Sequence, residues 1–164
     1  MKILLFTIIG SLTLVLHAQK TLSNLLEKHN IESIPYISID SLAANQNRFI
    51  LLDAREKNEY KISHLEKAIH VGYNHFKIDS VQKKIPNKTT KIVVYCSLGI
   101  RSKSITDSLL KAGYTNVKNL YGGIFEWKNN SLPIYNTSEK ETDSIHAFSK
   151  KWHKWLKKGI QIYD

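Results

Sequence analysis

Two long apolar runs constrain the fold of this chain more than any other feature of its sequence. "FILLDAR" (49–55) and "KIVVYC" (91–96) are almost continuously apolar and then give way to polar residues. Strands that are buried on both faces have this pattern, because neither face needs polar residues to meet water. Both runs are therefore predicted to be central strands of a parallel sheet.

Shorter segments alternate as strand and helix around these two runs. Strand patterns cover 36–39, 68–71 and 116–122. Helical patterns lie between the strands, over 40–46, 58–65, 76–85, 102–114 and 123–130. This alternation predicts an α/β fold with an open parallel sheet of about five strands, flanked by helices on both faces. In such sheets ligands bind beyond the carboxyl ends of the strands.

The first 18 residues have the pattern of a secretory signal peptide. Lys2 gives a positive start, residues 3–16 are mostly apolar, and Ala18 is a small residue for cleavage before Gln19. The apolar stretch is shorter than the roughly 20 residues that a membrane-spanning helix needs. We therefore expect an exported protein, periplasmic or secreted, with an uncleaved anchor as the alternative.

The rest of the chain is predicted to hold three parts. Residues 19–34 form a helical lead, 35–135 the α/β domain, and 136–164 a C-terminal helix and tail. On a helical wheel, one face of the last part carries Ile145, Phe148, Trp152, Trp155 and Leu156. The opposite face carries five lysines, at 150, 151, 154, 157 and 158.

This pattern predicts an amphipathic helix from about Ile145 to Lys158. Its aromatic face could pack on the α/β domain, which would bury Trp152 and Trp155. The alternative is a contact with an anionic membrane surface or an acidic protein.

The formal net charge of +10 comes mostly from lysine, since only three of the 24 basic residues are arginine. Proteins that read bases rely on arginine forks. We therefore expect a lysine-coated surface and no nucleic-acid partner. The seven histidines show no metal-like spacing, so we expect neither a metal nor a cofactor.

Cys96, the only cysteine, ends the second apolar run, where a parallel sheet places its ligands. The loop after it reads Ser97-Leu98-Gly99-Ile100-Arg101-Ser102 and leads into a helix. Backbone N–H groups in a tight loop, the positive end of the helix and the Arg101 cation would all favour a thiolate. Gly99 allows the positive φ that such a loop requires. The alternative is a buried, inert cysteine.

This loop resembles the active-site loop of rhodanese-like sulfurtransferases. The likeness continues in "FILLDAREKNEYKISHLEKAIHV" (49–71) and in "LLKAGYTNVKNLYGGIFEW" (109–127). Ser63 replaces a usual glycine before His64, and Ser97 replaces a frequent second loop arginine. The second change implies weak affinity for small oxyanions.

The resemblance implies that Cys96 accepts a sulfane sulfur as a persulfide and passes it to a thiol or to cyanide. Arg101 would hold the anionic end of a small donor such as thiosulfate, and residues 97–102 would surround the sulfur. Asp53 and Arg55 would support this loop, or form a structural ion pair with Glu56 or Glu59. His64 and Trp127 match family positions and are expected to pack the fold.

Two alternatives to a sulfurtransferase remain at this point. One is a persulfide carrier or binding module that does not turn over. The other is a cysteine phosphatase, a class that carries Cys-x5-Arg where this chain has Cys-x4-Arg. The shorter loop favours sulfur chemistry.

Overall fold

The computed structural model describes residues 22–26 and 34–163. They belong to two units, Met1–Glu32 and Ser33–Asp164. In the first unit residues 22–26 are helical, within the predicted helical lead, whereas the predicted signal peptide lies outside the described residues. All that follows concerns the second unit, residues 34–163.

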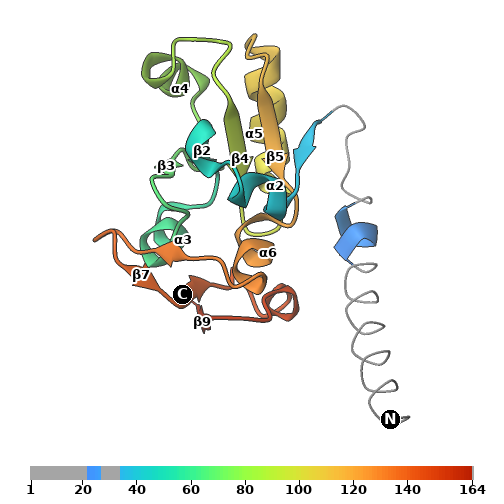
Figure 1. The fold of residues 1–164 in the computed structure, drawn as a ribbon, viewed down its shortest axis with the longest axis vertical. Helices are drawn as coiled ribbons and strands as arrows, with labels where there is room; N and C mark the ends of the chain where they lie inside the picture. The colour runs from blue at the N-terminus through green and yellow to red at the C-terminus, as the bar shows by residue number, and fades with distance from the viewer. Residues whose placement is uncertain (1–21, 27–33, 164) are drawn as a thin grey trace. The chain divides into compact units, whose positions relative to one another are not determined.

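A five-stranded sheet, parallel throughout, forms the centre of this unit (Figure 1). Its strand order is β1-β5-β4-β2-β3, with the two long apolar runs side by side as β4 and β2. The bounds are β1 Tyr36–Ile37, β2 Ile50–Asp53, β3 Ile69–His70, β4 Ile92–Tyr95 and β5 Val117–Leu120. The predicted α/β fold class with about five parallel strands is confirmed.

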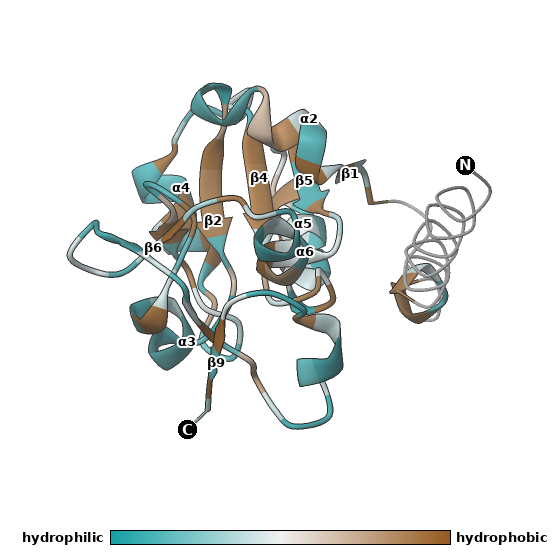
Figure 2. Cartoon of the chain, turned by 60° about the horizontal axis from the view of Figure 1, so that its bottom comes forward, coloured by the Kyte–Doolittle hydropathy of each residue, from teal (hydrophilic) through white to brown (hydrophobic). Residues whose placement is uncertain are grey.

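Helices connect the strands, as parallel pairing requires. The connecting helices are α2 (Ile39–Ala43), α3 (Lys57–Ile62), α4 (Ile78–Lys84) and α5 (Arg101–Lys111), with a 3-10 turn η1 at Gln46–Arg48, and α6 (Gly123–Asn129) follows β5. Figure 2 shows the mostly apolar strands β2 and β4 at the centre of the unit, with polar and apolar residues alternating along the surrounding helices.

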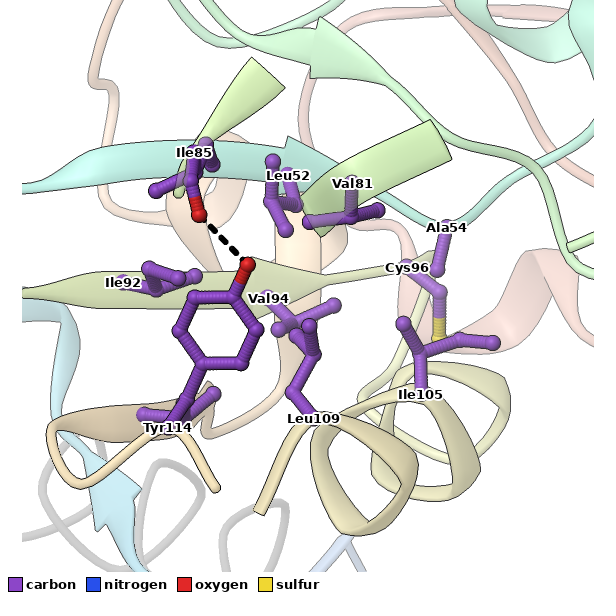
Figure 3. Close-up of a cluster of buried hydrophobic side chains, with 11 residues drawn as sticks. Leu52, Ala54, Val81, Ile85, Ile92, Val94, Cys96, Ile105, Leu109 and Tyr114 are labelled. Atoms are coloured by element: carbon purple, nitrogen blue, oxygen red, sulfur yellow. Dashed lines mark hydrogen bonds between the residues drawn. The ribbon is translucent and has the colours of Figure 1, made fainter. Parts of the chain in front are cut away.

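The core on one face of the sheet joins β2 and β4 to α4 and α5 (Figure 3). Its buried residues are Leu52, Ala54, Val81, Ile85, Ile92, Val94, Cys96, Ile105, Leu109, Tyr114 and Val117. Neighbouring residues of a strand point to opposite faces, so Leu51 and Val93 point away from this cluster. Both are buried as well, at 3% and 0% exposed, which means that the second face is also covered.

The register of β2 against β4 positions the residues of interest. Asp53 pairs with Tyr95, so the two strands end at the same level. Cys96 follows Tyr95 directly, and Arg55 follows Asp53 after one residue. Both therefore lie beyond the carboxyl ends of β2 and β4, where the ligand was predicted to bind.

The C-terminal segment does not form the predicted amphipathic helix. Residues 144–146 are strand β8 (Ser144–His146), which pairs in parallel with β9 (Ile160–Ile162). Between them lies only a 3-10 turn, η2 (His153–Trp155). A shorter pair, β6 (Ile134–Tyr135) with β7 (Glu141–Thr142), precedes it and crosses the predicted boundary at 135.

The helical periodicity of this segment was misleading, because its buried residues come from separate pieces of chain. Ile145 in β8 is 0% exposed, and Leu156 after η2 is 3% exposed. Trp152 and Trp155 are half-buried rather than buried, and Phe148 is 44% exposed. The positive φ of Phe148, 63°, is incompatible with a continuous right-handed helix.

The segment nevertheless packs on the α/β domain. β8 lies against α3. Lys128 of α6 forms an ion pair with Asp143, with 2.6 Å between Nζ and Oδ1. Asn129 of α6 donates to the Trp155 carbonyl at 2.9 Å and accepts from the Lys157 N–H at 2.7 Å. We call residues 143–163, held in this way, the C-terminal strap.

Among the described residues, no helix combines the length and the apolar character that crossing a membrane requires.

Candidate active site

Cys96 follows the last residue of β4 and is 2% exposed. Its side chain points to the face of the sheet on which Ile105 of α5 lies (Figure 3). The N–H of Gly99 donates to Sγ, with 3.1 Å between the two atoms. Gly99 thus supplies one backbone N–H donor of the loop that reaches the sulfur.

The loop can curl around the sulfur because Gly99 has a φ of +95°. A Cβ at this position would lie 3.0 Å from the Leu120 carbonyl oxygen, so a side chain would crowd β5 as well as strain the backbone. Asn119 of β5 holds the loop through two side-chain hydrogen bonds. Its Nδ2 donates to the Gly99 carbonyl at 2.7 Å, and its Oδ1 accepts from the Ser102 hydroxyl at 2.7 Å.

The start of α6 holds the other side of the loop. The Ile124 N–H donates to the Cys96 carbonyl at 2.9 Å, and the Phe125 N–H donates to the Ser97 carbonyl at 3.1 Å. Gly123 permits this approach, since a Cβ on it would overlap both of these carbonyls. The loop after Cys96 is therefore held by β5 on one side and by the start of α6 on the other.

Arg101, the first residue of α5, forms a two-pronged ion pair with Glu59 of α3. Nη1 and Nη2 each donate to a different carboxylate oxygen at 2.7 Å. The Ser97 hydroxyl joins this pair, accepting from Arg101 Nη2 at 3.0 Å and donating to Glu59 at 3.2 Å. Glu59 is 2% exposed and Arg101 15%. Arg101 is thus already paired with an anion, a partner that the sequence analysis did not assign to it.

The pKa values of this pair follow from its burial and its contacts. Burial would raise the pKa of Glu59, but the hydrogen bonds and charge of Arg101, with smaller contributions from Arg55 and the Glu56 N–H, outweigh burial and lower it. Burial would lower the pKa of Arg101, yet the Glu59 hydrogen bonds and the nearby Cys96 raise it. Both groups are therefore held in their charged forms.

We predict that Glu59→Gln lowers the free energy of unfolding by about 2–3 kcal/mol at neutral pH, the contribution of strong charge-assisted hydrogen bonds. Because folding lowers the pKa of Glu59, the contribution is present above the unfolded value of about 4.3 and is lost as the pH falls through the lower folded value. The difference in unfolding free energy between wild type and variant should thus be constant above about pH 6. It should shrink progressively as the pH falls below about 4. Urea unfolding across this range measures it, and a difference that stays constant down to pH 3 would contradict the assignment.

Asp53 and Arg55, the predicted supporting residues, pair with each other. Arg55 Nη2 lies 2.6 Å from Asp53 Oδ2, and Arg55 Nε lies 3.0 Å from Oδ1. Neither side chain is exposed. Arg55 also donates to the Ser63 carbonyl at 2.5 Å. The alternative prediction, an ion pair of Arg55 with Glu56 or Glu59, is wrong. Arg55 bonds Asp53, and Glu59 bonds Arg101.

His64 and Trp127, expected to pack the fold, are 1% and 2% exposed. The His64 ring stacks on Tyr60, with 4.1 Å between centroids, and the Trp127 indole N–H donates to the Pro133 carbonyl at 2.9 Å. In the part of the chain that the structure describes, no three His, Cys, Asp or Glu side chains gather as a metal site would require.

Comparison with known proteins identifies the family. Residues 38–130, more than half of the chain, match the family described as the Rhodanese-like domain. The chain belongs to this family. The match ends before β6, so the C-terminal strap lies outside the family's shared part.

Two curated relatives and one solved structure place the rhodanese-like domain among known proteins. It is 32% identical to "Adenylyltransferase and sulfurtransferase UBA4" of Candida albicans, over 58% of this chain and 24% of the relative. It is 31% identical to a tRNA uridine(34) hydroxylase of Buchnera aphidicola, over 65% and 38%. The structure of a rhodanese-related protein from Thermoplasma volcanium superposes with a TM-score of 0.53 and 25% identity, covering 61% of this chain and 96% of that one. The chain thus spans less than two-fifths of the two curated relatives.

The strap lines part of the pocket of the rhodanese-like domain that contains Cys96. This pocket has a volume of about 140 Å³ and is lined by Cys96, Ser97, Leu98, Ile100, Arg101, Phe148 and Trp152. Of the predicted loop residues, Gly99 and Ser102 are not in the lining: Gly99 contacts Sγ through its N–H, and Ser102 bonds Asn119. Phe148 and Trp152 of the strap form a wall of this pocket, a contact that the sequence did not predict.

Four residues of this site were not predicted from the sequence: Asn119, Glu59, Phe148 and Trp152. Asn119 had a usable signal, since an amide within an otherwise apolar strand is a buried polar group that needs partners. Glu59 is one of two acidic residues at the start of α3, and nothing local shows which of them reaches Arg101. Phe148 and Trp152 were assigned to a helix, and their place depends on strand pairing that the periodicity does not show.

Proposed function

We propose that this chain is a sulfurtransferase that accepts a sulfane sulfur on Cys96 and passes it to a thiophilic acceptor. One observation carries the proposal: Cys96 lines a pocket, and its Sγ accepts the Gly99 N–H at 3.1 Å. A thiolate held by a backbone donor and open to a pocket can attack a sulfur donor.

The reaction balances without a metal or an outside oxidant. With thiosulfate, the Cys96 thiolate attacks the outer sulfur, the S–S bond of thiosulfate breaks, and sulfite leaves with the bonding electrons. The product is a persulfide anion on Cys96, one sulfur beyond Sγ. An acceptor thiolate or cyanide then attacks this outer sulfur, which regenerates the Cys96 thiolate and gives a new persulfide or thiocyanate.

The surroundings of Cys96 support this chemistry. The α5 N-terminus begins five residues after Cys96, and its first N–H groups lack acceptors within the helix. The positive end of a helix attracts anions, and Arg101, the first residue of this helix, lines the same pocket as Cys96. The family, and a relative whose name includes sulfurtransferase, support the same reaction class. The predicted signal peptide supports a site of action outside the cytoplasm.

We expect thiosulfate treatment to add the mass of one sulfur atom to the intact protein. Cyanide or a reducing thiol should remove the added mass and, for cyanide, release an equal amount of thiocyanate. Intact-mass spectrometry measures the first step, and a colorimetric thiocyanate assay measures the second. Loading without release to any acceptor would favour the persulfide carrier instead. A protein that stays unloaded by every sulfane donor but hydrolyses an aryl phosphate would favour the cysteine phosphatase.

A further inference from the structure

Two aromatic side chains that lie outside the family match line the same pocket as Cys96. Phe148 and Trp152 meet edge to face, with 6.4 Å between ring centroids and an interplanar angle of 68°. This is a favourable geometry for an aromatic pair. Together with Leu98 and Ile100 from the loop they give the pocket an apolar lining around the sulfur.

The aromatic wall is held in place rather than loosely attached. Phe148 has a φ of +63°, a conformation that a bulky residue adopts only where its surroundings enforce it. Its N–H donates to Nδ1 of His146 at 3.0 Å, and His146 is 3% exposed within β8. The ion pair between Lys128 and Asp143 fixes the chain just before β8. The position of Phe148 is therefore determined by the fold of the strap.

The charge of Arg101 is covered from two sides. Its guanidinium is paired with Glu59, and Cζ lies 4.5 Å from the centroid of the Phe148 ring. The ring gains a cation–π contact, and the cation loses solvent on that side. Arg101 is the only basic residue among the described residues that line this pocket. A small, doubly charged anion would therefore find no unpaired cation there.

The size of the pocket fits one ring. An apolar cavity of about 150 Å³ in a protein can hold benzene, and this pocket measures about 140 Å³. We propose that Phe148 and Trp152 determine specificity, by selecting organic sulfur donors and acceptors whose sulfur carries an aromatic or compact alkyl group over inorganic thiosulfate. This inference rests on the proposed sulfurtransferase function and names its substrate class.

Benzenethiosulfonate is a suitable probe, because it differs from thiosulfate in carrying a phenyl ring and one negative charge fewer. The Cys96 thiolate attacks its outer sulfur, the bond between that sulfur and the sulfonyl sulfur breaks, and benzenesulfinate leaves with the electron pair. The product is the same Cys96 persulfide that thiosulfate gives. Any difference in rate between the two donors therefore reflects recognition of the donor and departure of its leaving group.

The test compares second-order rate constants of persulfide formation with the two donors in each protein. Because the leaving groups differ chemically, the informative quantity is the change in the rate ratio between variants. Phe148→Ala, Phe148→Leu and Trp152→Ala should each lower the ratio of benzenethiosulfonate to thiosulfate about tenfold, the scale of one lost apolar contact in a pocket. High salt prevents the exposed lysines of the strap from favouring the more highly charged donor. The ratio does not depend on the fraction of protein that is folded.

Trp155→Ala is the matched control. Trp155 lies in the same strap and is half-buried, but it does not line the pocket, so its loss should leave the ratio within about twofold. A ratio that is unchanged in all three pocket variants, or lowered equally by Trp155→Ala, would overturn the proposal.

A second measurement separates this proposal from the proposed function. Benzyl methanethiosulfonate and the anionic sulfonatoethyl methanethiosulfonate both modify a thiolate, releasing methanesulfinate and forming a mixed disulfide. The labelling ratio is the rate constant with the benzyl reagent divided by that with the sulfonatoethyl reagent. We expect the pocket variants to lower this ratio about tenfold, even in a protein that no sulfane donor loads. If no donor loads Cys96 but the labelling ratio responds, the sulfurtransferase proposal fails and the aromatic site stands. If labelling does not respond, the aromatic site fails.

Discussion

Cys96→Ser should give a folded protein that gains no sulfur from any sulfane donor. Cys96 is the only thiol in the chain, and its Sγ is the atom that the Gly99 N–H approaches at 3.1 Å. A serine hydroxyl is almost entirely protonated at neutral pH and cannot form a persulfide. Intact-mass spectrometry after thiosulfate treatment should show the unmodified mass only, and thiocyanate formation should fall to the rate without enzyme.

This loss should not come from unfolding. A serine hydroxyl occupies less space than the thiol and can accept the same N–H, so we expect a change in unfolding free energy of about 1 kcal/mol. Urea midpoints and circular dichroism measure it. Wild-type protein whose thiol has been alkylated is a second control that keeps the sequence. Sulfur loading of the serine variant would refute Cys96 as the carrier.

The central strands could be predicted from the sequence because burial on both faces removes every alternative pattern. Ile50–Leu52 and Ile92–Val94 have no polar position that could face water, a pattern typical of inner strands, and the structure pairs them directly. Cys96 comes directly after the second run. Because the carboxyl ends of parallel strands lie on the same side of a sheet, its position at that side could be predicted. Local residues were sufficient for these inferences.

The partners of Arg55 and Arg101 could not be predicted, because they depend on distances between elements. Arg101 and Glu59 are 42 positions apart, and their pairing requires the end of β4 and the start of α3 to lie at the same edge. Asp53 is only two positions from Arg55, yet extended residues at this spacing do not necessarily meet. The arginines were identified as important, while their carboxylate partners needed the tertiary structure.

The strap shows where periodicity fails as a guide. Apolar residues at 145, 148, 152, 155 and 156 match a helix, but β8 and β9 are joined by parallel pairing across more than a dozen residues. Because the helix prediction was wrong, the aromatic wall of the Cys96 pocket, which lies in this segment, could not be predicted.

Asp53→Asn should reduce the free energy of unfolding by about 3–5 kcal/mol, because it leaves the Arg55 charge without its anion in the interior. Neither side chain of the pair is exposed, and Arg55 cannot reach water by a small movement. Burial alone would lower the pKa of Arg55, but the charge and hydrogen bonds of Asp53 raise it, so the guanidinium stays charged while Asp53 is present. Urea or thermal unfolding measures the loss. Adding Arg55→Met should recover part of it, since removing both charges avoids the unpaired ion.

The chain contains a matched control for this prediction. Asp107 and Lys111 form an ion pair with the same 2.6 Å between nitrogen and oxygen, but Lys111 is 76% exposed and Asp107 26%. Asp107→Asn removes the same charge at the same distance, where water and salt can replace the partner, and should cost no more than about 0.5 kcal/mol. Because the two ion pairs have the same nitrogen–oxygen distance, the ratio of the two losses in unfolding free energy measures the effect of burial. If both variants lose the same free energy, Asp53 and Arg55 do not form the buried pair that supports the edge of the sheet beside Cys96.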